Sequence, residues 1–491
     1  MATRTATKAA KASAPAEVKS ELVEALERAL GPDGVLWQQY DLMLYEYDGS
    51  IDKARAQAVV FPKSSADVSA VIKLCAARGV PYTARGAGTG LSGGAIPSLG
   101  GVLISFSRMN RILELDFENQ RAVVEPGLVN LRLSQAVAHE KLLYVPDPSS
   151  QKACTIGGNV GENSGGPHTL RYGVTTNHTL GLEFVLPNGD IVETGGKALD
   201  TPGYDLTGLY VGSEGTLGMA TRIVARLVPM AESVKTLLVV FPTVEAASHA
   251  VSGIIARRIV PAALEMMDNL CIQAVESRAK VGFPLDAAAI LIVEVEGLAE
   301  EIETFAEEIE AVCRGYDALD VRLAKDDAER ARLWAARKGA FGAIGAITPD
   351  YYTVDGVVPR SKLPEVLAKI ADISTSSGLR IANVFHAGDG NLHPLILFDE
   401  DIPGQTERTI EAGAEIMRLC AEMGGTLSGE HGIGMEKKDL MPLIFSEDDV
   451  EVMQRVKRGL DPDGHCNPDK VFPTPGRCLE MFGRRGMAVG W

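Results

Sequence analysis

The chain has 491 residues and a mass of 52.2 kDa, which is too long for one hydrophobic core and predicts two or three domains. Its 48 Lys and Arg residues are outnumbered by 65 Asp and Glu residues, and the net charge of -17 disfavours nucleic acid and anionic membrane surfaces as partners. With 46% hydrophobic residues the composition is that of a globular protein, and the longest apolar runs, such as 237–241, are too short to span a bilayer.

The cysteines are scattered along the chain, and no two of them form a C-x-x-C pair. This pattern favours free thiols in a reducing cytosol over disulfides, a cysteine metal site or an iron–sulfur cluster. The alanine-rich start lacks the apolar core of a secretory signal, so we expect a disordered tail over 1–16 and a cytoplasmic location. The seven residues are Cys75, Cys154, Cys271, Cys313, Cys420, Cys466 and Cys478.

Regularly spaced apolar residues predict a β-α-β unit early in the chain. The expected strands cover 58–62 and 80–84, and the helix between them has Ser65 as its cap. A separate helix is expected over 17–30. Short strands with glycine-rich connections and few helices should follow, over residues 102–106, 112–117, 122–126 and 182–186.

A second β-then-α pattern begins at residue 237, which places a domain boundary between Val228 and Val234. We expect an α+β second domain with its helices on one face of a sheet. Its strands should cover 290–295, 321–323, 352–358 and 381–385, and its helices 301–312, 327–341, 362–374 and 450–460. The predicted organisation is a tail over 1–16, a helical segment over 17–51, a first domain over 52–231, a second domain over 232–475 and a tail over 476–491.

A glycine-rich loop follows the strand that ends near Arg85, and Gly88, Gly90 and Gly93 in it spell G-x-G-x-x-G. A nicotinamide site of the Rossmann type would need a helix at the third glycine, and Pro97 prevents one. A nest of backbone N–H groups for a diphosphate is the remaining functional interpretation, and a plain surface turn is the alternative. Similar loops at 146–166 and 212–218 favour an extended ligand, such as a dinucleotide, that is contacted mainly by backbone.

These three loops resemble the FAD-binding domain of the vanillyl-alcohol oxidase and p-cresol methylhydroxylase superfamily. The first loop contains no histidine between Arg85 and Ile96, so the resemblance favours non-covalent FAD. It implies that the diphosphate is held by Arg85, Gly86, Ala87, Gly88, Thr89, Gly90, Leu91 and Ser92, and that the rest of FAD is contacted by Pro148, Thr155, Gly158, Asn159, Asn163, Gly165, Gly215 and Ile223.

The segment 386–393 predicts a β-hairpin that brings two histidines together. Asp389-Gly390 is typical of a type I′ turn, and counting outward from it places His386 opposite His393. Two imidazoles and the carboxylate of Glu430 could bind Zn²⁺ or a similar ion and leave positions open for substrate. Taken singly, each histidine could equally be an ordinary core or surface residue.

His431 follows the expected metal ligand Glu430 directly, and we expect it to be the base that accepts the proton of a metal-bound hydroxyl. Arg337 could bind a substrate carboxylate, because a guanidinium matches the planar geometry of a carboxylate. The alternative is that Arg337 belongs to a solvated helix face with Arg330 and Lys338.

The W-x-x-R-K sequence at 334–338, the histidine hairpin, G-E-H-G-I-G at 429–434 and the stretch 466–470 resemble the C-terminal domain of FAD-linked 2-hydroxy acid dehydrogenases. This group includes D-lactate and D-2-hydroxyglutarate dehydrogenases. The resemblance implies that His386, His393 and Glu430 bind a divalent metal, that His431 is the base and that Arg337 holds the carboxylate.

Two departures from the hydroxyglutarate enzymes concern groups that could hold a second carboxylate. Thr353 stands near Asp355 where those enzymes carry a lysine, and Leu395 replaces an asparagine. The resemblance therefore favours a small monocarboxylate. It is greatest to the FAD-bearing subunits of bacterial glycolate dehydrogenases, which implies oxidation of glycolate, or of D-lactate, to glyoxylate or pyruvate.

That resemblance also implies partners, namely a second FAD-domain subunit and an iron–sulfur subunit that passes electrons towards quinone. Any attachment to the inner membrane would then be through those partners. Three alternatives remain open: a stand-alone D-lactate or D-2-hydroxy acid dehydrogenase, a metal-dependent hydrolase of a nucleotide-like substrate, and a non-catalytic scaffold.

Overall fold

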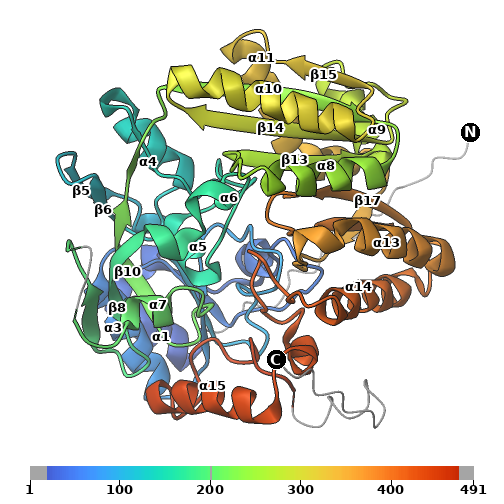
Figure 1. Ribbon diagram of the computed structural model, residues 1–491. Helices are drawn as coiled ribbons and strands as arrows, with labels where there is room; N and C mark the ends of the chain where they lie inside the picture. The colour runs from blue at the N-terminus through green and yellow to red at the C-terminus, as the bar shows by residue number, and fades with distance from the viewer. Residues whose placement is uncertain (1–18, 199–201, 475–491) are drawn as a thin grey trace, which may run out of the picture.

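The computed structural model describes residues 19–198 and 202–474, which form two lobes (Figure 1). The first lobe contains the described residues up to 229, and the second lobe is built on one large sheet that begins at residue 233. The predicted tails over 1–16 and 476–491 lie outside the described residues. No helix in the described ranges is both long and apolar enough to cross a membrane.

The first sheet of the first lobe has four strands in the order β1-β2-β4-β3. β2 and β3 both run parallel to β4, as expected for a β-α-β unit. The strands are β1 (Val35–Leu36), β2 (Ala58–Val60), β3 (Tyr82–Arg85) and β4 (Val102–Ser105), and the helices that accompany them are α1 (Glu21–Leu30), α2 (Gln39–Leu42) and α3 (Ser65–Ala76).

The cap of α3 is Ser64 and not the predicted Ser65, because the Ser64 hydroxyl accepts the N–H of Asp67 at 3.2 Å. The helix itself packs Val68, Val71 and Ile72 into the core beneath the sheet. The predicted apolar periodicity was therefore correct, and the cap was one residue off.

The second sheet of the first lobe is antiparallel, with the order β5-β6-β10-β8-β9. Its strands are β5 (Ile112–Asp116), β6 (Arg121–Val124), β8 (Thr179–Val185), β9 (Ile191–Gly195) and β10 (Met219–Arg226). A short pair, β7 (Leu142–Leu143) and β11 (Val228–Pro229), lies beside it.

Helices are more frequent around this second sheet than the sequence predicts. The most important is α5 (Ile156–Glu162), which occupies part of a stretch expected to be a loop. The Thr155 hydroxyl caps it by accepting the N–H of Gly158 at 3.3 Å. The others are α4 (Asn130–Val137), α6 (Thr169–Tyr172) and α7 (Leu206–Tyr210).

The second lobe is a seven-stranded sheet in the order β15-β12-β14-β13-β17-β18-β16, with neighbouring strands antiparallel throughout. The strands are β12 (Ser233–Phe241), β13 (Ala263–Asp268), β14 (Ala289–Gly297), β15 (Asp320–Leu323), β16 (Asp350–Thr353), β17 (Arg380–Phe385) and β18 (Pro394–Phe398). The predicted strand over 352–358 is shorter than expected, and Val357 instead forms isolated bridges to Asn391 and Thr426.

Helices cover both faces of this sheet, so the expectation of one covered face was wrong. On β12, Leu237 and Val239 pack into the core with α8, α10, α13 and α14, whereas Leu238 packs on the opposite face with α9, α11 and α12. A strand that is apolar on both faces must be covered on both. The helices are α8 (Val244–Ala256), α9 (Asn269–Ala279), α10 (Ala299–Gly315), α11 (Asp327–Lys338), α12 (Ala340–Ile344), α13 (Leu363–Ser377) and α14 (Gln405–Glu422).

The chain returns to the first lobe after the second lobe is complete. Figure 1 shows the last helix, α15 (Glu447–Leu460), lying against the first lobe. Beyond it, Cys466 pairs with Tyr82 of β3 and is buried in the core of the first lobe. The six cysteines of the described residues are all buried and free, as predicted.

Candidate active site

A cavity of about 370 Å³ lies between the two lobes, within the size range of small-molecule sites. The three glycine-rich segments of the first lobe form one wall. The second lobe contributes the opposite wall, with Lys338, Phe341, Tyr351, His393, Glu430 and His431. The cavity therefore joins the loops expected to hold FAD to the residues expected to carry the chemistry.

Most residues expected to contact FAD line this cavity. They are Gly86, Ala87, Gly88, Thr89, Gly90, Leu91, Pro148, Thr155, Gly158, Asn159 and Gly215. Five others do not appear in the wall. Arg85 and Ser92 are buried behind it, Asn163 and Gly165 follow α5, and Ile223 packs in the core of the first lobe.

Glycine is required where the first loop meets the start of α5. A Cβ atom on Gly86 would lie 2.4 Å from the Thr155 hydroxyl, and one on Gly157 would lie 2.4 Å from Cβ of Pro126. Gly88 has a φ of +70°, and a Cβ there would meet the guanidinium of Arg85. Because side chains are excluded at these three glycines, the backbone itself forms this part of the wall. Such a surface suits an extended ligand such as FAD.

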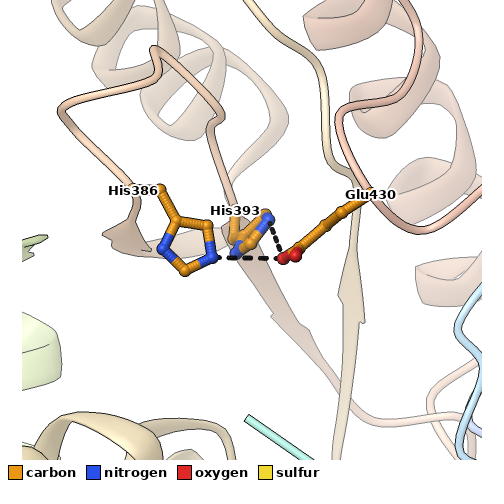
Figure 2. A group of neighbouring side chains, drawn as sticks. All are labelled: His386, His393 and Glu430. Atoms are coloured by element: carbon orange, nitrogen blue, oxygen red, sulfur yellow. Dashed lines mark hydrogen bonds and ion pairs between the residues drawn. The ribbon is translucent and has the colours of Figure 1, made fainter. Parts of the chain in front are cut away.

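His386, His393 and Glu430 converge on one point, and their nearest ligand atoms all lie within 4.8 Å of one another. Figure 2 shows the two imidazoles and the carboxylate pointing toward each other. The Glu430 Oε1 atom lies 3.1 Å from Nε2 of His386 and 3.3 Å from Nε2 of His393. Within the described residues, neither ring nitrogen of His393 has a hydrogen-bond partner. The Oε2 atom of Glu430 has none either. Buried donors and acceptors without partners fit a divalent metal ion at this point.

The hairpin that carries the two histidines differs in register from the prediction. β17 and β18 pair Asn383 with Pro394, and His386 bridges to Asn391, two positions away from the predicted partner His393. Gly390 has a positive φ but Asp389 does not, so the turn is not type I′. A shift of two residues keeps both histidines on the same face, and they meet as diagonal neighbours with ring centroids 5.0 Å apart.

A buried ion pair supports His386 from behind. The Nδ1 atom of His386 lies 2.8 Å from Oε1 of Glu265, and Oε2 of Glu265 lies 2.5 Å from Nη2 of Arg337. Arg337 is 0% exposed and does not line the cavity. Its neighbour Lys338 does line it, and donates to Asp147 at 2.8 Å and to Gln151 at 2.6 Å. The structure thus places Arg337 behind the histidine group and Lys338 at the cavity.

His431 lies beside the histidine–carboxylate group and stacks on His393, with ring centroids 4.9 Å apart. Its Nε2 atom is 4.0 Å from Oε1 of Glu430, and its Nδ1 atom is 3.9 Å from Oδ1 of Asp355. Asp355 is fully buried and forms an ion pair with Lys437. These contacts orient the imidazole at the wall of the cavity.

Burial and neighbouring charges set different protonation states in this group. Burial alone would lower the pKa of His386, but the carboxylates of Glu265 and Glu430 raise it to about 10. Burial would raise the pKa of Glu430, but His386 and the other histidines hold it at about 2. Burial lowers the pKa of His393 well below its usual value and also lowers that of His431. The lowered pKa values keep the imidazoles of His393 and His431 neutral, which suits His393 as a metal ligand and His431 as a general base.

The two-lobed fold, the glycine-rich cavity wall and the adjacent histidines are those expected of an FAD-dependent oxidoreductase. A family model described as FAD binding domain matches residues 56–195, and one described as FAD linked oxidases, C-terminal domain, matches residues 230–471. The chain belongs to this family of FAD-linked oxidases. The predicted fold class, the FAD cofactor and the oxidoreductase class are thereby confirmed, and no finding supports a metal-dependent hydrolase.

The chain is similar over most of its length to characterised relatives. It is 48% identical to glycolate oxidase subunit GlcD of Escherichia coli (strain K12), covering 91% of this chain and 90% of that protein. Identity is 40% with glycolate oxidase subunit GlcD of Bacillus subtilis (strain 168), over 94% and 98% of the two chains. It is 34% with D-lactate dehydrogenase of Anaerostipes hadrus, over 85% and 90%.

Solved structures confirm the fold. A crystal structure of p-cresol methylhydroxylase with substrate bound superposes with a TM-score of 0.77 at 18% identity, over 92% of this chain and 96% of that chain. Alkyldihydroxyacetonephosphate synthase superposes with a TM-score of 0.73 at 18% identity, over 93% and 87%. The expected superfamily fold is therefore the observed one.

The sequence alone does not indicate the roles of the buried carboxylates around the site. Glu265 bonds His386, Asp355 accepts the backbone N–H of His431 at 2.8 Å, and Glu214 accepts two backbone N–H groups of the same loop. The available signal was a charged residue inside an apolar run, as in Leu264-Glu265-Met266. A carboxylate in a buried strand must have a partner, although the sequence does not say which.

Proposed function

We propose that this chain oxidises a small 2-hydroxy acid, glycolate or D-lactate, to the corresponding 2-oxo acid with FAD as the electron acceptor. The observation that carries the proposal is the position of His431, a neutral imidazole beside the histidine–carboxylate group in a cavity whose other wall includes the glycine-rich segments of the first lobe. The names of the relatives, glycolate oxidase subunit GlcD and D-lactate dehydrogenase, support this substrate class.

In the proposed reaction each group of the chain has a separate task. When bound, FAD would supply the hydride acceptor, and a divalent ion held by His386, His393 and Glu430 would make a substrate hydroxyl more acidic. His431 accepts the hydroxyl proton because its imidazole is neutral and faces the cavity. Loss of one proton and one hydride converts the CH–OH group to a carbonyl, which balances the reaction.

We propose that FAD is held non-covalently along the first-lobe wall. The residues proposed for this role are those named from the sequence, of which Gly86 to Leu91, Thr155 and Gly215 line the cavity. His393 and His431 also line it, but both already have roles in the second-lobe wall.

A substrate carboxylate is best bound by a cationic side chain, and the last turn of α11 carries two, Arg337 and Lys338. We propose that Arg337 binds this carboxylate and that its guanidinium leaves Glu265 when substrate binds. Lys338 lines the cavity without such a change. Thr353 and Leu395 are buried within the sheet and add no cationic group, which favours a monocarboxylate.

We further propose that the chain works with partner subunits, a second FAD-domain subunit and an iron–sulfur subunit, and that it is cytoplasmic with membrane attachment only through them. Two of the similar proteins are themselves called subunits of glycolate oxidase, which supports the need for partners. The isolated chain should then reduce an artificial dye but not a quinone. Direct and rapid quinone reduction by the isolated chain would contradict this proposal.

A dye-linked assay of the purified, FAD-loaded chain tests the substrate class. Glycolate, D-lactate, L-lactate and D-2-hydroxyglutarate are compared at equal concentrations, with and without added Zn²⁺ or Mn²⁺. We expect turnover with glycolate or D-lactate to exceed that with D-2-hydroxyglutarate at least tenfold. Preference for the dicarboxylate would overturn the substrate assignment while leaving the enzyme class intact.

A further inference from the structure

The segment 429–435 carries Glu430 and His431, and the second lobe holds its first half. The Oδ2 atom of Asp355 accepts N–H groups from Gly429 at 3.0 Å, Glu430 at 2.9 Å and His431 at 2.8 Å. One buried carboxylate therefore fixes three successive backbone groups. This arrangement explains how the second lobe positions Glu430 and His431, but it leaves the second half of the segment to other partners.

The first lobe holds the second half of the segment through Glu214. The Oε1 atom of Glu214 accepts the N–H of Ile433 at 2.7 Å, and Oε2 accepts the N–H of Gly434 at 2.6 Å. The backbone oxygen of Ser92 adds a bond from Met435 at 2.8 Å. Both Ser92 and Glu214 belong to glycine-rich loops of the first lobe. These hydrogen bonds therefore connect the first-lobe wall of the cavity to the second-lobe segment that carries Glu430 and His431.

Glu214 pays a conformational cost for this position. Its φ is +53°, in the left-handed region that non-glycine residues seldom adopt, and its side chain is buried. The next residue, Gly215, has a φ of +68° and lines the cavity. The Glu214 carboxylate therefore lies in the turn that is expected to contact FAD, and it points toward the second lobe.

The approach of the two lobes at this point excludes side chains. A Cβ atom on Gly432 would lie 2.9 Å from Oε1 of Glu214, and one on Gly434 would lie 2.0 Å from the backbone oxygen of Ser92. Glycine at both positions allows the segment to approach the carboxylate closely. Two short hydrogen bonds and two sterically required glycines indicate a built contact and not an incidental one.

We propose that Glu214 is a positioning residue that holds the segment 429–435 against the first-lobe wall of the cavity. In this way it would keep His431 and Glu430 correctly placed relative to bound flavin. The inference rests on the proposed function for the roles of those two residues. Glu214 itself acts through the backbone of Ile433 and Gly434 and does not take part in proton or hydride transfer. Its loss should loosen the segment while the glycine backbone still binds FAD.

Hydrogen exchange followed by mass spectrometry on the FAD-loaded chain tests this, with Glu214→Ala and the closely isosteric Glu214→Gln. The Gln variant keeps one acceptor oxygen and the side-chain volume, so it gives the measurement even if the Ala variant does not fold. We expect exchange in peptides covering 432–435 to rise at least tenfold in Ala and less in Gln. Flavin content and exchange in the first lobe should stay unchanged.

Glu125→Ala is the matched control. Glu125 is also a buried first-lobe carboxylate that accepts a backbone N–H, from Arg111 at 2.8 Å, but it does not line the cavity. Its removal should leave exchange at 432–435 unchanged. Any general loosening of the first lobe would appear in this control as well.

A kinetic measurement separates positioning from stability. The rate of flavin reduction by substrate should fall at least tenfold in Glu214→Ala, with KM changed less than threefold, because the bonds act on alignment and not on substrate binding. Loss of FAD, unchanged exchange at 432–435, or raised exchange with an unchanged reduction rate would each overturn the proposal. The exchange result needs no substrate, so failure of the substrate assignment would be seen separately.

Discussion

His431 is the residue on which the proposed chemistry depends most. Replacing it with Asn removes the proton acceptor but keeps a polar side chain of smaller size. General base catalysis contributes roughly 10²–10⁴-fold, so the rate of flavin reduction should fall by that order while flavin remains bound. The measurement is stopped-flow absorbance of the flavin band under anaerobic conditions.

The control for this variant is His249→Asn, which changes an exposed histidine on α8 that is far in sequence from the site. It should reduce flavin at the wild-type rate. If His431→Asn also kept that rate, another group would have to accept the proton, and His431 would be a structural residue.

The buried pair of Arg337 and Glu265 gives a second prediction at this scale. Arg337→Met leaves the buried Glu265 carboxylate with His386 as its remaining cationic partner, and loss of the guanidinium should lower the free energy of unfolding by about 3–5 kcal/mol. Urea unfolding of the apoprotein measures this. The double variant Arg337→Met with Glu265→Leu should recover most of the loss, because the carboxylate is removed and His386 keeps its ion pair with Glu430.

The same single variant tests the proposed binding of the substrate carboxylate by Arg337. If the guanidinium leaves Glu265 to bind the substrate, Arg337→Met should raise KM for the 2-hydroxy acid more than tenfold. An unchanged KM would show that Arg337 only stabilises the fold.

Individual residues were easier to predict than their partners. His386, His393 and Glu430 stand out because histidines and a glutamate are concentrated in glycine-flanked loops, and the structure brings them together. Glu265 comes from β13 and Asp355 from the segment that follows β16, both far away in sequence, and nothing in one sequence says which loop they will meet. Long-range contacts therefore set the supporting residues of the site.

At the scale of elements, His168 joins the two lobes through a buried network. It precedes α6, and its ring lies 2.9 Å from Asp147 in the first lobe and 3.3 Å from Glu294 of β14. Burial alone would lower the pKa of His168, but the carboxylates of Asp147 and Glu294 raise it to about 10. His168 is therefore a cation that holds carboxylates of both lobes.

This raised pKa predicts how stability depends on pH. The protonated form is favoured by folding, so the contribution of His168 is complete below its ordinary pKa of 6.5 and is lost as pH rises towards 10. The free energy of unfolding should be lower in His168→Gln than in the wild type at pH 6.5, and the difference should shrink by pH 10. A difference that is constant over this range would show that His168 acts by shape alone.

The helix α5 allows a matched pair of glycine substitutions. Gly157→Ala should destabilise the apoprotein by about 1–3 kcal/mol, because its Cβ would lie 2.4 Å from Pro126 and the helix must shift. Gly161→Ala in the same helix meets nothing within 4 Å and should be neutral or stabilising. Thermal unfolding of the two apoproteins compares them directly, and equal melting temperatures would contradict the packing argument.

Elements with a regular apolar pattern could be predicted from the sequence, and those set by tertiary contacts could not. In the second lobe the expected strands over 290–295, 321–323 and 381–385 correspond to β14, β15 and β17, and the expected helices over 301–312, 327–341 and 362–374 to α10, α11 and α13, since their periodicity is local. The strand β13 and the helices α9 and α14 were not predicted. The helix α5 was missed because glycines at 157, 158 and 161 disfavour a helix unless packing requires it. The hairpin register was off by two residues because the turn is not the type that Asp389-Gly390 favours.

At the scale of the whole molecule, the active site exists only where the two lobes meet. We propose a boundary between Val228 and Val234, because β11 pairs with β7 in the first lobe and β12 begins the large sheet of the second lobe. The chain then returns to the first lobe at α15, where Lys457 donates to the backbone oxygen of Thr216 at 2.6 Å. We therefore propose that 52–231 and 232–475 are separate domains as far as their sheets are concerned. The end of the second range, from α15 onward, packs against the first lobe.

The proposed oxidation of a small 2-hydroxy acid can be tested by the visible absorption spectrum of the purified chain under anaerobic conditions, before and after addition of glycolate or D-lactate. We expect a flavin band that bleaches within seconds on addition of one of these acids, and that remains on addition of L-lactate. A flavin band that no 2-hydroxy acid bleaches, even with Zn²⁺ or Mn²⁺ present, would contradict the proposed function.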